Sequence, residues 1–161
     1  MKTIKRIGVR ATRVRVADSD LHGTVVSNSR TVVAIGAQLI GTEDQEVMLS
    51  FALDTKNRIL GYTEVARGGL NCASVLGREM YRAAVLIGAA AIVIVHNHPS
   101  GSAAPSAEDT AVTERLVQAG LLLGIEVVDH VIVAQGGGSF SYLDAGLLPK
   151  PQRYSTKEIQ Q

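Results

Sequence analysis

A short apolar run that ends in two histidines constrains this chain more than any other feature. Residues 91–95 are rich in Ile and Val, which favours a buried β-strand, and His96-Asn97-His98 follows directly. Residues two apart in an extended chain point to the same side, so both imidazoles can reach one metal ion. The sequence therefore predicts a buried strand with two histidines at its end, which on this spacing alone are either metal ligands or, more commonly, a satisfied or solvent-exposed pair.

A third candidate ligand follows a short, stiff loop. Seven residues separate His98 from Ser106, and two prolines and a glycine among them can turn the chain toward a new helix. Asp109 would lie in the first turn of that helix, where its carboxylate could complete a zinc site with a fourth position for water. Taken alone, Ser-x-x-Asp before an apolar helical run favours a helix-capping box over a metal site. Ser106 can serve in both, because capping uses only one lone pair of its hydroxyl.

The remaining periodicity predicts an α/β protein. Apolar residues recur at helical spacing in some segments and as short strand-like runs in others. Three-layer packing of a mixed β-sheet flanked by helices accommodates this order. The expected helices are residues 31–39 (capped by Ser27 or Ser29), 78–88 and 106–123 (ended by Gly124), and the expected strands are 47–53, 59–66, 91–95, 125–134 and 139–142.

Composition excludes several classes of protein. With 161 residues and 46% hydrophobic content the chain can build one core, and a net charge of +1 gives no strong bulk attraction to nucleic acid or membranes. The single cysteine, Cys72, cannot form an intramolecular disulfide and suits a reducing compartment. No segment is typical of a secretory signal or a bilayer span, so we expect a cytoplasmic protein without membrane partners.

The two ends differ from the centre. We expect residues 1–24 to form a basic arm with a lead-in strand, and residues 149–161, which begin with Pro149-Lys150-Pro151, to form a flexible tail. A solvated arm is the more ordinary interpretation, but a weak DNA contact stays open. The arm's basic residues before Asp18 are Lys2, Lys5, Arg6, Arg10, Arg13 and Arg15.

Other polar residues receive structural interpretations. Asp129-His130 is interpreted as a polar step that opens a strand, in preference to a second metal pair or a catalytic dyad. Cys72 lies among small residues and is expected to be a structural thiol. Gly136-Gly137-Gly138 has no helix after it, so it predicts a turn.

These residues together resemble the metal-binding signature of the JAMM (JAB/MPN+) metalloenzymes. The signature is His-x-His, then seven residues, then Ser, two residues and Asp. The longer text HNHPSG followed by PSAED resembles the RadC-like branch, and the likeness covers roughly residues 25–148. It implies a cytidine-deaminase-like, JAMM-type three-layer sandwich. Further matches are residues 53–58, Arg78-Glu79, residues 129–133, and Ser139-Phe140 with Gly146-Leu147.

The resemblance also implies roles for particular residues. Zn²⁺ would be held by His96, His98 and Asp109, and Ser106 would donate to the developing oxyanion. A glutamate on a neighbouring strand would act as general base and then as general acid, and the match of the strand start nominates Glu46. Glu43, in the loop before that strand, is its competitor. Leu76-Gly77-Arg78-Glu79 departs from the His-Pro-Arg-Glu common in relatives, which alters the rim of the site.

Three functions follow from these observations. The first is a zinc metallohydrolase that acts on a peptide or isopeptide-linked protein. The second is a DNA-associated protein, either a metal-dependent nuclease or a repair accessory, and the third is a non-catalytic MPN-type scaffold. The expected edge strand at residues 139–142 could pair with a second copy of the chain or with an extended peptide.

Overall fold

A computed structural model describes residues 21–68 and 75–152 of the chain. The predictions for most of the basic arm, for Cys72 and for residues 153–161 lie outside these ranges. The elements of the described part are α1 (Ser29–Ile40), β1 (Val47–Leu53), β2 (Ile59–Arg67), α2 (Gly77–Leu86), β3 (Ala91–His98), α3 (Ala107–Leu123), β4 (Glu126–Ala134) and β5 (Ser139–Ser141).

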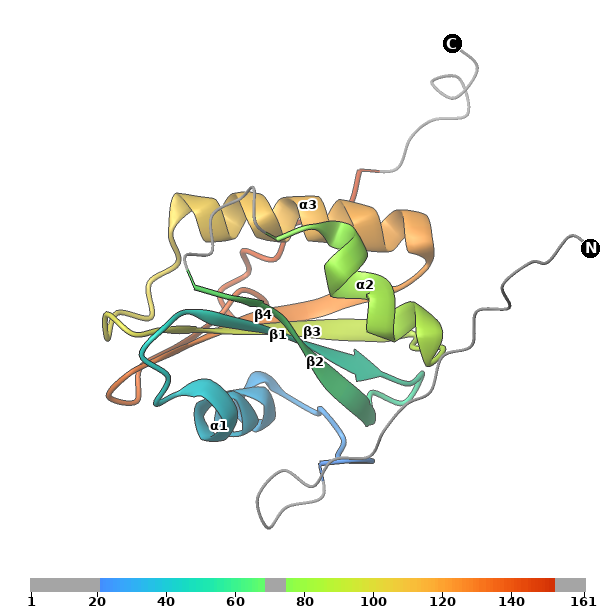
Figure 1. The fold of residues 1–161 in the computed structure, drawn as a ribbon. Coiled ribbons are helices and arrows are strands. Elements are labelled where there is room, and N and C mark those ends of the chain that lie inside the picture. Colours follow the sequence, from blue (N-terminus) through green and yellow to red (C-terminus); the bar gives the residue numbers. More distant parts are fainter. Residues whose placement is uncertain (1–20, 69–74, 153–161) are drawn as a thin grey trace, which may run out of the picture.

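The strands form one mixed sheet in the order β2-β1-β3-β4-β5. β1 runs antiparallel to both β2 and β3, β3 is parallel to β4, and β5 is antiparallel to β4. Figure 1 shows α1 on one face of this sheet and α2 and α3 on the other. The predicted three-layer α/β sandwich, with a mixed sheet flanked by helices, is confirmed.

Two apolar cores result, one on each face of the sheet, so the single core expected from the chain length is wrong. Ile92 and Ile94 of β3 pack with residues of α2 and α3, whereas Val93 and Val95 pack with residues of α1. A strand covered on both faces needs apolar residues at every position, which explains the unbroken run before the histidines. His96 follows Ile94 by two residues and therefore faces α3.

The ends of the elements differ from the predictions in a few places. α1 is capped by Asn28, whose side chain accepts a hydrogen bond from Thr31 N at 3.1 Å, so the predicted caps Ser27 and Ser29 are wrong. α2 ends at Leu86, two residues earlier than predicted. Gly124 ends α3 in the left-handed conformation (φ 68°), as expected. Within the described ranges, the chain has no helix long and apolar enough to cross a membrane.

We predict that Gly120→Ala destabilises the protein. A Cβ at this position in α3 would overlap the carbonyl oxygen of Ile125 and lie 2.5 Å from the Tyr81 hydroxyl. Overpacking of this kind costs about 1–3 kcal/mol, which outweighs the better helix propensity of alanine. Urea denaturation should therefore show a lower free energy of unfolding.

The matched control is Gly77→Ala in α2. There the added Cβ would make an ordinary contact, 3.5 Å from the Ala119 Cβ, so stability should be equal to or above that of the wild type. Equal stability of both variants would contradict the packing of α3 against Tyr81.

Candidate metal centre

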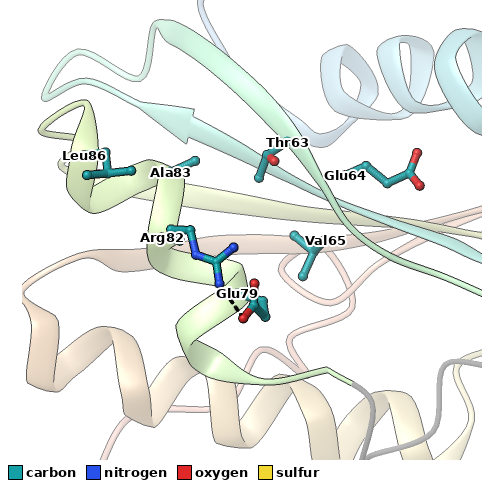
Figure 2. A pocket seen from close by; sticks show the side chains of 7 residues that line it. All are labelled: Thr63, Glu64, Val65, Glu79, Arg82, Ala83 and Leu86. Carbon is teal, nitrogen blue, oxygen red and sulfur yellow. Dashed lines mark hydrogen bonds and ion pairs between the residues drawn. The ribbon is translucent and has the colours of Figure 1, made fainter. Parts of the chain in front are cut away.

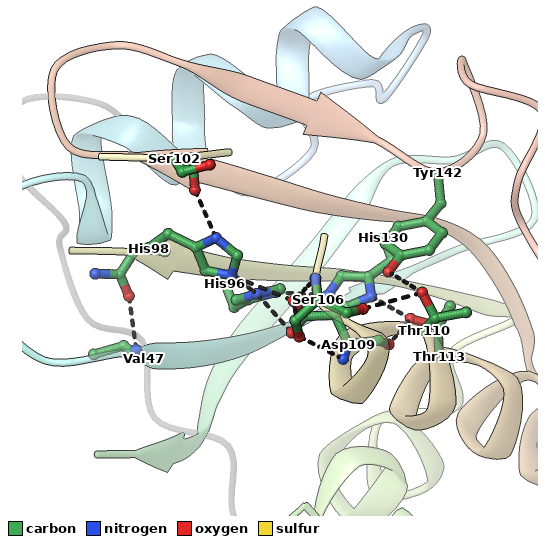
Figure 3. Close-up of polar contacts among 11 residues, drawn as sticks. Val47, His96, His98, Ser102, Ser106, Asp109, Thr110, Thr113, His130 and Tyr142 are labelled. Carbon is green, nitrogen blue, oxygen red and sulfur yellow. Dashed lines mark hydrogen bonds and ion pairs between the residues drawn. The ribbon is translucent and has the colours of Figure 1, made fainter. Parts of the chain in front are cut away.

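The three predicted ligands converge where β3 ends and α3 begins. His96 and His98 lie in the last residues of β3, and Asp109 lies in the first turn of α3 (Figure 3). His96 Nε2 is 3.1 Å from Asp109 Oδ1, His98 Nε2 is 3.4 Å from Asp109 Oδ2, and the two Nε2 atoms are 2.9 Å apart. Together these side chains form a group that could hold a metal ion.

The hydrogen bond on the far side of His98 determines which of its nitrogens is free. Its Nδ1 lies 2.7 Å from the carbonyl oxygen of Ser102, in the loop that follows β3. A carbonyl can only accept, so Nδ1 carries a hydrogen, and in the neutral ring Nε2 then bears the lone pair. That lone pair points toward His96 and the carboxylate of Asp109.

The donor set and its spacing fit a small divalent ion. Zinc binds imidazole nitrogen and carboxylate oxygen with bonds of about 2.0–2.1 Å, and in tetrahedral geometry such bonds separate the ligand atoms by about 3.4 Å. The three observed separations run from 2.9 to 3.4 Å. Without a cation, two imidazole nitrogens and a carboxylate at these distances must share protons between them, so the arrangement favours a bound positive charge.

Asp109 also completes the predicted capping box. Ser106 Oγ accepts from Asp109 N at 3.0 Å, and Asp109 Oδ2 accepts from Ser106 N at 2.7 Å. Burial alone would raise the pKa of Asp109, but the hydrogen bond and charge of His96 and the two bonds from Ser106 outweigh it and hold this pKa below its ordinary value. The carboxylate is therefore ionised at neutral pH.

The hydroxyl of Ser106 both accepts and donates a hydrogen bond within the capping box. The oxygen accepts from Asp109 N, and the hydroxyl donates to Asp109 Oδ2 at 2.7 Å. To donate to a substrate, the hydroxyl must turn away from the carboxylate. The carboxylate would keep its bond from Ser106 N during that rotation.

Glu46 precedes β1, beside the strand that carries the histidines. Met48 pairs with His96 across the β1–β3 ladder, and opposite residues of a ladder point to the same face. Glu46 lies two positions before Met48 and just outside β1, so the alternation of an extended chain would place it on the side of the sheet that His96 and His98 occupy. Its side chain is half-buried.

Asn97, between the two histidines, holds the segment around Glu46. Its side chain faces away from α3, where Oδ1 accepts from Val47 N at 2.7 Å and Nδ2 donates to Gln45 O at 3.0 Å. The competitor Glu43 forms an ion pair with Arg67.

The interpretation of Asp129-His130 as a strand-opening step is wrong. β4 begins at Glu126, and both side chains are buried inside the strand. Asp129 accepts from Ser141 Oγ at 2.6 Å and from Leu143 N at 3.0 Å, which ties down β5 and the turn after it. His130 lies directly behind the candidate ligands, with Nε2 2.8 Å from His96 Nδ1. Burial holds the pKa of His130 well below its ordinary value.

A separate hollow lies between β2 and α2 (Figure 2). Its polar side chains include Arg82, which pairs with Glu79 at 2.6 Å on the helix surface. It contains none of the predicted site residues. Its lining is Thr63, Glu64, Val65, Glu79, Arg82, Ala83 and Leu86.

The three-layer fold with a His-His-Asp group at a strand–helix junction defines a domain of the JAB/MPN class. Comparison with protein families specifies the branch. The profile described as RadC-like JAB domain matches residues 26–147, and the chain belongs to this family.

Relatives of known sequence agree with this assignment. A UPF0758 protein of Moorella thermoacetica is 43% identical over 122 residues, which are 76% of this chain and 53% of the relative. A UPF0758 protein of Trichlorobacter lovleyi is 47% identical over 104 residues, or 65% of this chain and 45% of the relative. The chain thus spans about half the length of the curated relatives it matches. Their names state no activity.

We predict that Ser106→Ala lowers the stability of the metal-free protein by about 1 kcal/mol, because the start of α3 loses its cap. Ser106→Thr keeps a hydroxyl and should stay close to the wild type. Thermal denaturation in the presence of a chelator measures both. An alanine variant as stable as the wild type would show that the capping box contributes nothing to the fold.

Proposed function

We propose that this chain is a zinc-dependent metallohydrolase that cleaves peptide or isopeptide bonds with a metal-activated water. The observation that carries the proposal is the convergence of His96, His98 and Asp109 on one point. Two imidazoles and one carboxylate, with a fourth position for water, are a recurring ligand set of catalytic zinc in hydrolases. Membership of the RadC-like JAB family supports the same chemistry.

Solvent access differs between the ligands in a way that suits a substrate site. The side chain of His96 is 1% exposed, whereas that of His98 is 12% exposed. The group is therefore closed on the side of β4 and reachable on the side of the loop after β3. A reacting amide would approach from that side.

A bound metal and two residues of the chain would divide the proton and charge transfers between them. Bound Zn²⁺ would supply a water acidic enough to lose a proton near neutral pH. Glu46 would accept that proton and return it to the leaving amine as the C–N bond breaks. Ser106 would turn its hydroxyl toward the carbonyl oxygen of the substrate, while its oxygen still accepts from Asp109 N.

The partner in this proposal is a peptide or an isopeptide-linked protein. The cytoplasm remains the expected location, because the single cysteine suits a reducing compartment. β5 forms an edge of the sheet, where an extended peptide or a second copy could add a strand. The basic residues of the arm lie outside the described ranges, so DNA contact stays a prediction from the sequence.

We predict about one zinc per chain in the purified protein, lost in His98→Ala and in Asp109→Ala, because each removes one of three ligands. His22→Ala is the matched control, since it deletes an imidazole near Leu60 that is not part of the group. Elemental analysis after dialysis gives the stoichiometry. A wild-type protein that binds no metal would overturn the proposed function.

We predict that Glu46→Gln keeps the metal but lowers amide hydrolysis by about 100-fold or more, because the general base is lost. Glu43→Gln should remain within about twofold, since it only breaks a surface ion pair, which contributes little. Both variants are assayed on peptide, isopeptide-linked and DNA substrates. Cleavage of DNA alone, abolished by Glu46→Gln, would replace the peptidase with a nuclease.

A further inference from the structure

His130 has no part in the proposed chemistry, although the structure holds it on several sides. It is fully buried within β4, next to β3 and under α3. Its Nε2 lies 2.8 Å from His96 Nδ1, and its Nδ1 lies 2.6 Å from Thr113 Oγ1 (Figure 3). Its ring also stacks on Tyr142, with centroids 5.1 Å apart and planes 9° from parallel. A ring held in this way has one orientation.

The hydroxyl of Thr113 determines which nitrogen of His130 carries the hydrogen. Thr113 Oγ1 lies 2.6 Å from the carbonyl oxygen of Asp109 and can only donate to it. A hydroxyl has one hydrogen, so Thr113 must accept from the imidazole. His130 Nδ1 therefore carries the hydrogen, and in the neutral ring Nε2 bears the lone pair.

The lone pair of His130 in turn determines the tautomer of His96. Because His130 Nε2 accepts, His96 Nδ1 must donate across the 2.8 Å contact. His96 Nε2, which lies 3.1 Å from Asp109 Oδ1, is then the ring nitrogen that can offer a lone pair to a metal. In the opposite tautomer a hydrogen on Nε2 would occupy the place of the metal.

We propose that His130 and Thr113 are positioning residues that set His96 in the tautomer able to bind the metal. This inference rests on the proposed metal site at His96, His98 and Asp109. In both candidate histidine ligands a hydrogen bond from Nδ1 leaves Nε2 to face the metal. The acceptor for His96 is His130, which Thr113 orients, and the acceptor for His98 is the carbonyl of Ser102.

The choice of an imidazole as partner has a further consequence for the site. A metal-bound histidine commonly donates to a carboxylate, which raises the basicity of the ligand and adds negative charge. Here His130 supplies an imidazole nitrogen in the place of that carboxylate. Asp109 is the single carboxylate among the three candidate ligands, and this way of orienting His96 would add no second anion beside a bound cation.

The first test measures zinc affinity by competition with a chromogenic chelator. Thr113→Val has nearly the same shape but no hydroxyl, so His130 loses its fixed tautomer, and affinity should fall about 10-fold or more. Thr113→Ser keeps the hydroxyl and should bind within about threefold of the wild type. Tyr81→Phe is the matched control. It removes a buried hydroxyl of α2 that donates to Leu116 O in α3, the helix that also carries Thr113, and this bond does not involve the candidate ligands.

The second test reads the tautomer directly, in metal-free protein. ¹⁵N NMR of the imidazoles should show a hydrogen fixed on His96 Nδ1 in the wild type. His130→Leu should give a mixture of tautomers, whereas His130→Gln supplies an amide oxygen as acceptor and should restore the wild-type pattern in part. A merely structural role for His130 would change stability and leave the tautomer ratio as it is.

The outcomes separate this inference from the function on which it rests. A wild-type protein without zinc overturns the metal site itself. Zinc bound by the wild type and by Thr113→Val with equal affinity, together with an unchanged His96 tautomer in His130→Leu, overturns the positioning role alone. Loss of affinity in Thr113→Val but not in Tyr81→Phe, with a mixed tautomer in His130→Leu, supports it.

Discussion

The parallel pairing of β3 with β4 is the constraint on which the candidate site depends. Parallel neighbours cannot be joined by a tight turn, so the chain must cross over the sheet, and here α3 forms that crossover. The helix has to begin beside the end of β3 in order to return to the start of β4. Its N-terminus, with Ser106 and Asp109, is thereby brought to the end of β3 where the two histidines lie.

Local patterns make much of this arrangement predictable. The period of two in His-x-His and the spacing of the capping box each concern a few neighbouring residues, so His96, His98, Ser106 and Asp109 can be grouped from their order in the chain alone. The start of β1 is predictable because a run of apolar residues begins there. The cap of α1 is not, because three consecutive residues from position 27 are all good caps, and only the hydrogen bond to Thr31 selects the middle one.

The residues that sequence reasoning misses act across strands. His130 meets His96 only because β4 lies beside β3 in a particular register, with His130 opposite Ile94. Asn97 holds the segment before β1 through contacts to residues about fifty positions earlier in the chain. A local sequence pattern predicts neither the strand register nor the partner of a side chain. The one signal for such a contact is a polar residue inside an apolar strand, because a buried polar group needs a hydrogen-bond partner. Asp129-His130 carries that signal, but a polar pair at a strand end has the same local appearance.

The alternation of the His-Asn-His triplet links the site to the correct alignment of the sheet. His96 and His98 face α3, and Asn97 between them faces the opposite layer, where its amide satisfies backbone groups near Val47. A slip of β3 by one residue would exchange these faces, bury both imidazoles against the α1 layer and leave the amide without its partners. The chain can therefore bring its candidate metal ligands together only after β1 and β3 have paired in the correct register, so a correctly formed His-His-Asp group is itself a sign of correct folding.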